Sequence, residues 1–290
     1  MNWAIALRLG RVSNLPTVWT NTLAGIVLAN GSIADARTLP LIVALSLFYV
    51  AGMYLNDAYD ADIDARERPG RPIPSGEISA KTVFTAGFAM MALGLALLFW
   101  VGFGVAAGSG IGPAMGGLGL GAAIVLYNRR HKDNPLSPVL MGLCRVLVYV
   151  TAGLAVADEL PRALMSGALL LLCYLIGLTY VAKQETLGEV RNLWPLLFLG
   201  APLVYALLTA LESPTAALLS LAFVLCVGVA LWLLRRRQPG DVPRAVISLI
   251  AGISLLDAVL IAGAGNLPVA WLAVAGFALT MVLQRFVPGT

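Results

Sequence analysis

The stretch Asn56–Asp64, with the sequence NDAYDADID, comes directly after an apolar segment and decides how the fold is interpreted. Asp57, Asp60 and Asp64 are spaced three and four residues apart, so a helix would place them on one face. Like charges on one face repel each other unless a cation neutralises them, and oxygen ligands suit Mg²⁺, which completes its shell with substrate phosphates. Because carboxylates are costly at membrane depth, the pattern predicts a functional metal site rather than a polar helix end.

The composition of the chain is that of a polytopic helical membrane protein. Hydrophobic residues make up 59% and charged residues 12% of its 290 residues, whereas soluble domains carry about 25% charged residues. Apolar segments recur along the whole length, so we expect one integral-membrane domain over residues 1–290 and no cleaved signal peptide. The three cysteines and the single histidine, His131, show no metal-ligand spacing, which argues against metal sites built on those residues.

Hydropathy predicts an all-α bundle of nine to ten transmembrane helices. Several apolar segments are near the lower limit of about 17 residues for a membrane-spanning helix, so one of them could be re-entrant. The candidate spans are 13–29, 40–57, 82–103, 111–127, 137–156, 162–182, 193–211, 215–234, 244–264 and 268–286.

Lysine and arginine are distributed unevenly between the two sides that ten spans create. With the N-terminus in the cytoplasm, the outer connections hold only Arg37 and Arg162. By the positive-inside rule, this asymmetry predicts an inner-membrane protein with both termini and the aspartate cluster on the cytoplasmic side. No basic stretch is interleaved with aromatic residues, so we expect no nucleic-acid partner. The cytoplasmic basic residues are Arg66, Arg68, Arg71, Lys81, Arg129, Arg130, Lys132, Lys183, Arg191, Arg235, Arg236, Arg237 and Arg244.

A second acidic pair, Glu185 and Glu189, lies at the cytoplasmic end of the sixth predicted span. The two residues are four apart and share a helix face. Two acidic helix ends on one side of a bundle can hold two or more Mg²⁺ ions against one diphosphate, which neutralises the charge of a leaving group. The alternative is an interfacial acidic pair with Lys183 as a local partner.

Two further charged residues, Arg145 and Asp257, lie inside the fifth and ninth predicted spans. Each is expensive in hydrocarbon unless it is paired or faces a cavity. One interpretation is structural, with the two side chains paired to each other. In the other, Arg145 lines a diphosphate pocket, and Asp257 contacts the acceptor or orients a base.

The motif N-D-x-x-D-x-x-x-D of residues 56–64, followed by R-P-x-P-S-G at residues 71–76, resembles the first aspartate-rich motif of the UbiA superfamily of intramembrane prenyltransferases. Tyr127 and Lys132 look like the family's Y-x-x-x-x-K element, and the region around Asn14 looks like its first helix. The pair at 185 and 189 stands where the family's second motif has aspartates. That departure suggests a divergent, EboC-like branch.

The resemblance implies a Mg²⁺-dependent enzyme that ionises a polyprenyl diphosphate and transfers the prenyl group to an acceptor within the bilayer. It also implies a central apolar cavity that opens toward a cytoplasmic polar cap. A catalytically silent polyprenyl-lipid-handling protein and a transporter are the alternatives. The candidate catalytic residues and metal ligands are Asp57, Asp60, Asp64, Glu185 and Glu189. The candidate substrate ligands are Asn14, Asn56, Arg66, Arg71, Tyr127, Lys132, Arg145, Lys183 and Asp257.

Overall fold

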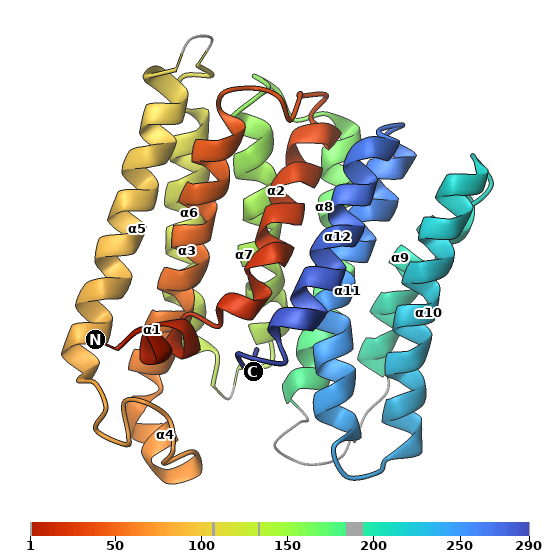
Figure 1. The fold of residues 1–290 in the computed structure, drawn as a ribbon. Helices are drawn as coiled ribbons and strands as arrows, with labels where there is room; N and C mark the ends of the chain where they lie inside the picture. The colour runs from red at the N-terminus through yellow and green to blue at the C-terminus, as the bar shows by residue number, and fades with distance from the viewer. Residues whose placement is uncertain (1, 106–107, 133, 184–193, 290) are drawn as a thin grey trace.

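The computed structural model describes residues 2–289 except 106–107, 133 and 184–193, and this part of the chain contains helices and no strand (Figure 1). Long helices run roughly side by side as a bundle, and the short helices α1 and α4 lie at one end of it. In chain order the elements are α1 (Trp3–Leu9), η1 (Val12–Asn14), α2 (Leu15–Leu28), α3 (Thr38–Tyr59), α4 (Ala61–Glu67), α5 (Ala80–Phe103), α6 (Gly112–Arg130), α7 (Ser137–Leu154), α8 (Arg162–Lys183), η3 (Trp194–Leu199), α9 (Gly200–Thr209), α10 (Pro214–Arg236), α11 (Asp241–Gly263) and α12 (Leu267–Leu283).

Helical segments occupy all ten predicted span positions, which confirms the all-α bundle. Within the described residues, six helices are long and apolar enough to cross a membrane by length and composition, namely α3, α5, α7, α8, α10 and α11. The seventh predicted span, 193–211, is divided between η3 and α9. Pro202 lies near the start of α9, where it has no N–H to continue the hydrogen bonding of the preceding turn.

Helix α2 joins two halves of the bundle. In the N-terminal half, α3 packs against α5 and α6 around the buried Phe48. In the C-terminal half, α11 packs against α2, α8, α10 and α12, and every residue from Ala251 to Ala262 is buried. A helix that is apolar all round is a core helix, and α2 contacts both α7 and α11.

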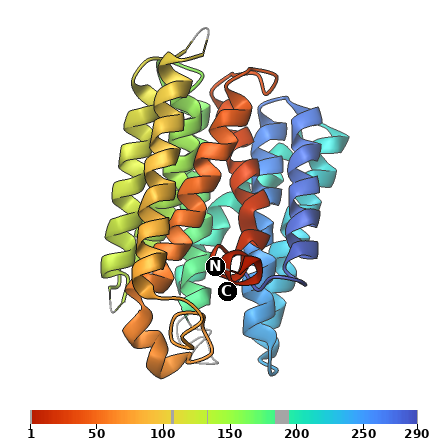
Figure 2. The same cartoon turned by 60° about the vertical axis from the view of Figure 1, so that its left-hand side comes forward.

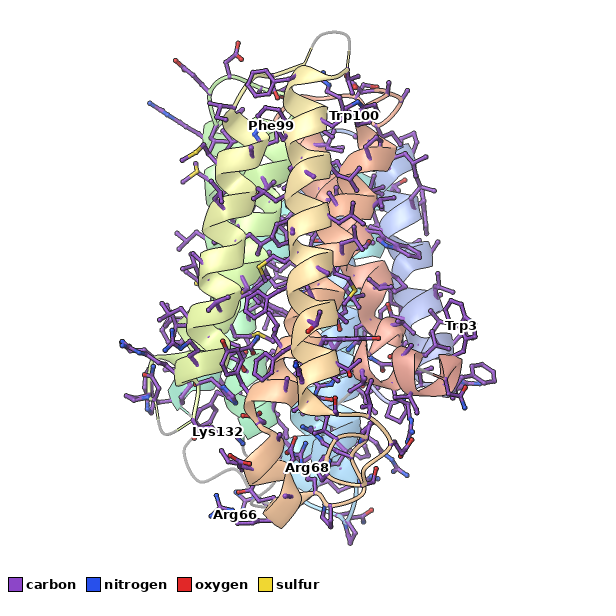
Figure 3. The ribbon with its side chains drawn as sticks, turned by 90° about the vertical axis from the view of Figure 1, so that its left-hand side faces the viewer. Trp3, Arg66, Arg68, Phe99, Trp100 and Lys132 are labelled. Carbon is purple, nitrogen blue, oxygen red and sulfur yellow. The ribbon has the colours of Figure 1, made fainter. Side chains whose placement is uncertain are left out.

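The outer face of the bundle is apolar, as a lipid-facing surface must be. Large apolar side chains stay exposed along α5 and α10, including Trp100, Leu221 and Trp232. Exposed apolar patches of this extent mark membrane or protein contact. In Figure 3, Phe99 and Trp100 lie at one end of the bundle, while Arg66, Arg68 and Lys132 lie at the other.

Both chain ends lie in the half of the bundle that holds the basic end (Figure 2), and the C-terminal segment contacts Asn14. The Asn14 side-chain amide donates to the Gly289 carbonyl at 3.0 Å, and its oxygen accepts from Gln284 at 2.7 Å.

In the loop before α3, Arg37 donates to the Asp35 carboxylate and lowers the pKa of Asp35 to about 2. Arg37 also donates to the Ala155 carbonyl at 2.9 Å, which ties that loop to the end of α7.

Candidate active site

The aspartate motif lies on two helices rather than one. Helix α3 ends at Tyr59 and α4 begins at Ala61, with Asp60 between them. Helical hydrogen bonds continue on both sides of this junction, from the Asp60 N–H to Asn56 and from the Asp64 N–H to Asp60. Because the motif is divided between two helices, the prediction that one helix carries all three aspartates is wrong in that detail. The side chains of Asp57, Asp60 and Asp64 nevertheless all turn inward and are at most 6% exposed.

Two arginines neutralise the first and third aspartates. Arg11 donates to Asp57 at 2.9 Å, and Arg71 donates to Asp64 at 2.6 Å and to Asp57 at 3.4 Å. Arg71 belongs to the R-P-x-P-S-G segment, which closes on itself through a hydrogen bond from the Ile78 N–H to the Pro72 carbonyl. This turn brings a guanidinium back to the aspartates that precede it in sequence.

Asp60 faces the residues that follow α6. His131 Nε2 lies 3.3 Å and Lys132 Nζ lies 4.0 Å from Asp60 Oδ2. The His131 ring stacks on Tyr127 with 5.0 Å between ring centroids. Asn56 donates to Asn128 Oδ1 at 3.2 Å, which links the end of α3 to the same end of α6. The predicted Tyr127 and Lys132 element therefore meets the aspartate motif.

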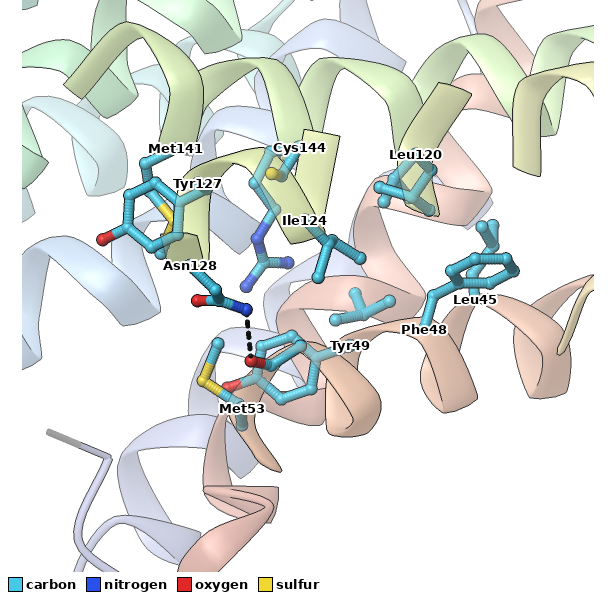
Figure 4. Close-up of a pocket in the computed structure, with 14 residues that line it drawn as sticks. Leu45, Phe48, Tyr49, Met53, Leu120, Ile124, Tyr127, Asn128, Met141 and Cys144 are labelled. Atoms are coloured by element: carbon cyan, nitrogen blue, oxygen red, sulfur yellow. Dashed lines mark hydrogen bonds between the residues drawn. The ribbon is translucent and has the colours of Figure 1, made fainter. Parts of the chain in front are cut away.

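These groups open into a cavity of about 600 Å³ between the two halves of the bundle. Its polar end is lined by Arg11, Asp60 and Asp64, and its other walls by apolar residues of α8 and α11 such as Leu175 and Ile253. A narrower apolar pocket of about 70 Å³ adjoins it between α2, α3, α6 and α7. In Figure 4 this pocket runs from Tyr127, Met141 and Asn128 toward Phe48, Leu45 and Leu120, and the dashed line marks the hydrogen bond from Asn128 to the Gly52 carbonyl.

The two intramembrane charges are linked through a third residue. Arg145 donates to Asn21 Oδ1 at 3.0 Å, and the Asn21 amide nitrogen lies 2.8 Å and 3.1 Å from the two Asp257 oxygens. Tyr149 also donates to Asp257, which is fully buried. Arg145 lines both the cavity and the apolar pocket, whereas Asp257 lines neither. Asp257 thus lies behind Asn21 and Arg145 rather than on the wall of either space, and its predicted role toward the acceptor stays a prediction.

The structure brings together most of the predicted site residues. Arg66 is an exception, because its side chain is exposed at the surface of α4. Glu185, Glu189 and the side chain of Lys183 lie outside the described part of the chain. The predicted residues that line the cavity are Asn14, Asn56, Asp60, Asp64, Arg71, Tyr127, Lys132 and Arg145. Asp57 instead lines an adjoining pocket of about 150 Å³, together with Arg8, Arg11 and Arg71.

Four charged or titratable residues of the cavity lining are not among the predicted metal or substrate ligands, namely Arg11, Glu67, Arg68 and His131. The sequence places Arg11 at the start of the segment that resembles the family's first helix, and it places Arg68 among the cytoplasmic loop charges. Arg11 adopts a left-handed backbone with φ of 42°, a conformation that is uncommon outside glycine. That local turn between α1 and η1 orients the side chain, and no pattern in the sequence reports it.

The site fits a Mg²⁺–diphosphate ligand better than a metal held by protein alone. In the described residues, no group of three Asp, Glu, His or Cys side chains converges on one point. Mg²⁺ usually binds one or two carboxylates and takes its other ligands from water and substrate phosphates. The buried Nδ1 of His131 has no hydrogen-bond partner among the described residues, so the polar end offers an unmet group beside Asp60.

Much of this sequence is similar to sequences of known proteins. The model of the UbiA prenyltransferase family matches residues 18–250. A digeranylgeranylglyceryl phosphate synthase from Ignicoccus hospitalis is 28% identical over 247 residues, which cover 78% of this chain and 76% of that protein. The one from Korarchaeum cryptofilum is 40% identical over 82 residues, and there the match spans only 28% of this chain and 29% of the relative.

Solved structures of low sequence identity share the fold. A UbiA homolog from Aeropyrum pernix K1 superposes with a TM-score of 0.65 at 15% identity, over 93% of this chain and 98% of that one. A UbiA homolog from Archaeoglobus fulgidus bound to GPP and Mg²⁺ gives a TM-score of 0.54 at 17% identity, over 91% and 99%. The resemblance expected from the motifs is confirmed, although the EboC-like assignment stays a prediction. The chain belongs to the UbiA prenyltransferase family and is a multi-pass membrane enzyme.

Proposed function

We propose that this chain transfers a prenyl group from a prenyl diphosphate, bound with Mg²⁺ at the polar end of the central cavity, to an acceptor held in the same cavity. The observation that carries the proposal is the set of buried carboxylates, each beside a cation, at one end of a cavity whose other walls are largely apolar. Such a cavity suits a ligand that has an anionic head group, bound together with divalent cations, and an apolar tail. The Archaeoglobus fulgidus homolog bound to GPP and Mg²⁺ supports it.

At the polar end of the cavity, some side chains would bind the metal ion and others would bind the phosphate groups. Asp57, Asp60 and Asp64 would hold Mg²⁺, and a bound Mg²⁺ neutralises the diphosphate as it leaves. Arg11, Arg71 and Lys132 would release these carboxylates and donate to phosphate oxygens, because charge-assisted hydrogen bonds from cations to phosphate are strong. Asn56 would contact the same head group. Glu185 and Glu189 would add metal ligands from the segment after α8, with Lys183 beside them.

The prenyl tail would lie in the apolar part of the cavity. The pocket of Figure 4 is lined by Leu45, Phe48, Leu120 and Ile124 and continues the larger cavity at Tyr49 and Met53. Its walls would keep water from the allylic cation after the diphosphate departs. The whole chain, residues 1–290, would act as one catalytic domain.

Removing the divalent cation is the direct test of this site. We expect EDTA to abolish diphosphate release and to weaken prenyl diphosphate binding to the full chain in detergent, and Mg²⁺ to restore both. The physical reason is that buried carboxylates repel a diphosphate unless metal lies between them. Binding is measured by isothermal titration and release by a diphosphate assay. Tight binding and unchanged release in EDTA would contradict the proposed site.

The finer topology is also a proposal: nine to ten spans, with the aspartates on the cytoplasmic side. Its support is the gathering of basic residues at the end of the bundle that holds the site. On a cysteine-free background, we expect Ser75→Cys and Arg237→Cys to react with a membrane-impermeant maleimide only after the membrane is opened. A cysteine at Asn30, in the loop at the other end, should react in intact cells. Labelling in the reverse pattern would place the site outside.

A further inference from the structure

Asp60 differs from the other two aspartates of the motif in its partners. Arg11 pairs with Asp57, and Arg71 pairs with Asp64. Asp60 is 6% exposed and lines the large cavity, and among the described residues no arginine lies within ion-pair distance of it. Burial of a carboxylate is costly unless it is paired or binds a metal. Asp60 is therefore the aspartate of the motif that is most available to Mg²⁺.

The backbone around Asp60 does not fix its side chain. The residue stands at the junction of α3 and α4, and its carboxylate makes no capping hydrogen bond to the start of α4. The helical hydrogen bonds at this junction use its main-chain carbonyl, which accepts from the N–H groups of Ile63 at 2.9 Å and Asp64 at 2.8 Å. A carboxylate that binds a metal is usually oriented by a hydrogen bond of its own. The orientation of Asp60 therefore depends on a residue from another part of the chain.

His131, the single histidine of the chain, lies beside this carboxylate. It follows α6 directly, its side chain is 12% exposed, and its ring stacks on Tyr127 with 25° between the ring planes. Its Nε2 lies 3.3 Å from Asp60 Oδ2, slightly beyond the ordinary N–H···O range of about 2.7–3.2 Å. Contacts of this kind often tighten when an active site binds its ligand. The stacked ring is thus held next to Asp60, at a distance from which a hydrogen bond can close.

The two ring nitrogens of His131 have different surroundings. Nδ1 is buried and has no hydrogen-bond partner in the part of the chain that the structure describes, whereas Nε2 faces Asp60. In a neutral imidazole one nitrogen carries the hydrogen, and a buried N–H without an acceptor is destabilising. The hydrogen therefore belongs on Nε2, where the Asp60 carboxylate accepts it. Lys132 Nζ, at 4.0 Å from the same oxygen and on a side chain that is 42% exposed, is too distant to make this hydrogen bond.

We infer that His131 is a positioning residue for the metal ion: its Nε2–H holds Oδ2 of Asp60 and leaves Oδ1 to bind Mg²⁺. This inference rests on the proposed function, because it needs Mg²⁺ to bind at Asp60. His131 acts through the carboxylate rather than on the substrate, and Lys132 stays available for phosphate oxygens. Its loss should therefore appear as a lower affinity for the metal, which typically falls about 10–100-fold when such an outer partner is removed.

The Mg²⁺ dependence of ligand binding to the full chain in detergent tests the inference. An unreactive prenyl thiodiphosphate is titrated by calorimetry at a series of Mg²⁺ concentrations, which gives the concentration for half-maximal binding. Mg²⁺-dependent binding by the wild type reports on the proposed function alone. His131→Phe keeps a ring that can stack on Tyr127 but removes the N–H. We expect this variant to keep the thermal midpoint of the wild type and to raise the half-maximal Mg²⁺ concentration by about 10-fold or more.

Two further variants separate the hydrogen bond from packing. His131→Gln places an amide N–H near the position of Nε2 and should bring the Mg²⁺ dependence close to that of the wild type. His131→Asn places its amide near the position of Nδ1, out of reach of Asp60, and this pair decides the matter if the phenylalanine variant fails to fold. In an Asp60→Asn background, His131→Phe should not raise the Mg²⁺ requirement further, because the two residues act as one unit. An unchanged or lower Mg²⁺ requirement in the phenylalanine and asparagine variants, or equal shifts in the glutamine and asparagine variants, would overturn the inference.

Discussion

Asp60→Asn should lower the rate of prenyl transfer by about 10²–10³-fold, the range typical for loss of one group that stabilises charge in a transition state. Asparagine has nearly the same shape but removes the charge that holds metal. The Asp60 carboxylate meets His131 at 3.3 Å and Lys132 only at 4.0 Å, so its loss breaks no strong structural pair. The thermal midpoint in detergent should therefore stay close to that of the wild type while diphosphate release nearly stops.

Asp62→Asn is the matched control for this change. Asp62 lies in the same NDAYDADID stretch and carries the same charge, but its side chain is exposed on α4. We expect wild-type turnover from it. Asp57→Asn is less informative, because it deprives both Arg11 and Arg71 of a carboxylate and can lower stability as well as rate. Wild-type turnover in Asp60→Asn would remove the aspartate motif from the mechanism.

Gly25→Ala should destabilise the fold by about 2 kcal/mol or more, because overpacking of a rigid interface commonly costs about 1–3 kcal/mol. A Cβ at Gly25 would lie 2.7 Å from Ala152 Cβ and 2.8 Å from the Tyr149 backbone oxygen. The second of these neighbours is backbone, so no side-chain rotation relieves the overlap. The variant forces α2 away from α7, and α7 carries both Arg145 and Tyr149.

The thermal midpoint and the monodisperse fraction on size-exclusion chromatography measure this effect. The control is Gly228→Ala on α10, where an added Cβ meets nothing within 4 Å. Because alanine favours helix over glycine by up to about 1 kcal/mol, this control should be neutral or slightly stabilising. Equal behaviour of the two variants would contradict the close contact between α2 and α7.

The positions of the helices were predictable from the sequence, because a long apolar segment in a bilayer satisfies its backbone N–H and C=O groups by forming a helix. The boundary between η3 and α9 at 199–200 was not predicted, since it lies inside a continuous apolar run that hydropathy does not divide. By contrast, the proximity of Tyr127 and Lys132 to the aspartate motif was predicted. That prediction came from the family resemblance and not from the spacing of the residues.

The partners of the aspartates could not be read from the sequence. Arg11 reaches Asp57 across 46 positions, through a left-handed turn that depends on tertiary packing. Asn21 did leave a signal, as a polar residue inside an apolar segment, but its two contacts lie 124 and 236 positions away. One sequence shows that such a residue is unusual and does not show what it contacts.

The hydrogen bond between Asn14 and Gly289 has a consequence for truncated variants. These residues are 275 positions apart, and both line the polar end of the cavity. Helix α12 contributes no residue to that lining among the described residues, whereas α3, α8 and α11 do. Deleting the segment after α12 would therefore remove one wall of the polar end and leave the Asn14 amide without its carbonyl, while the aspartates and the apolar walls keep their places.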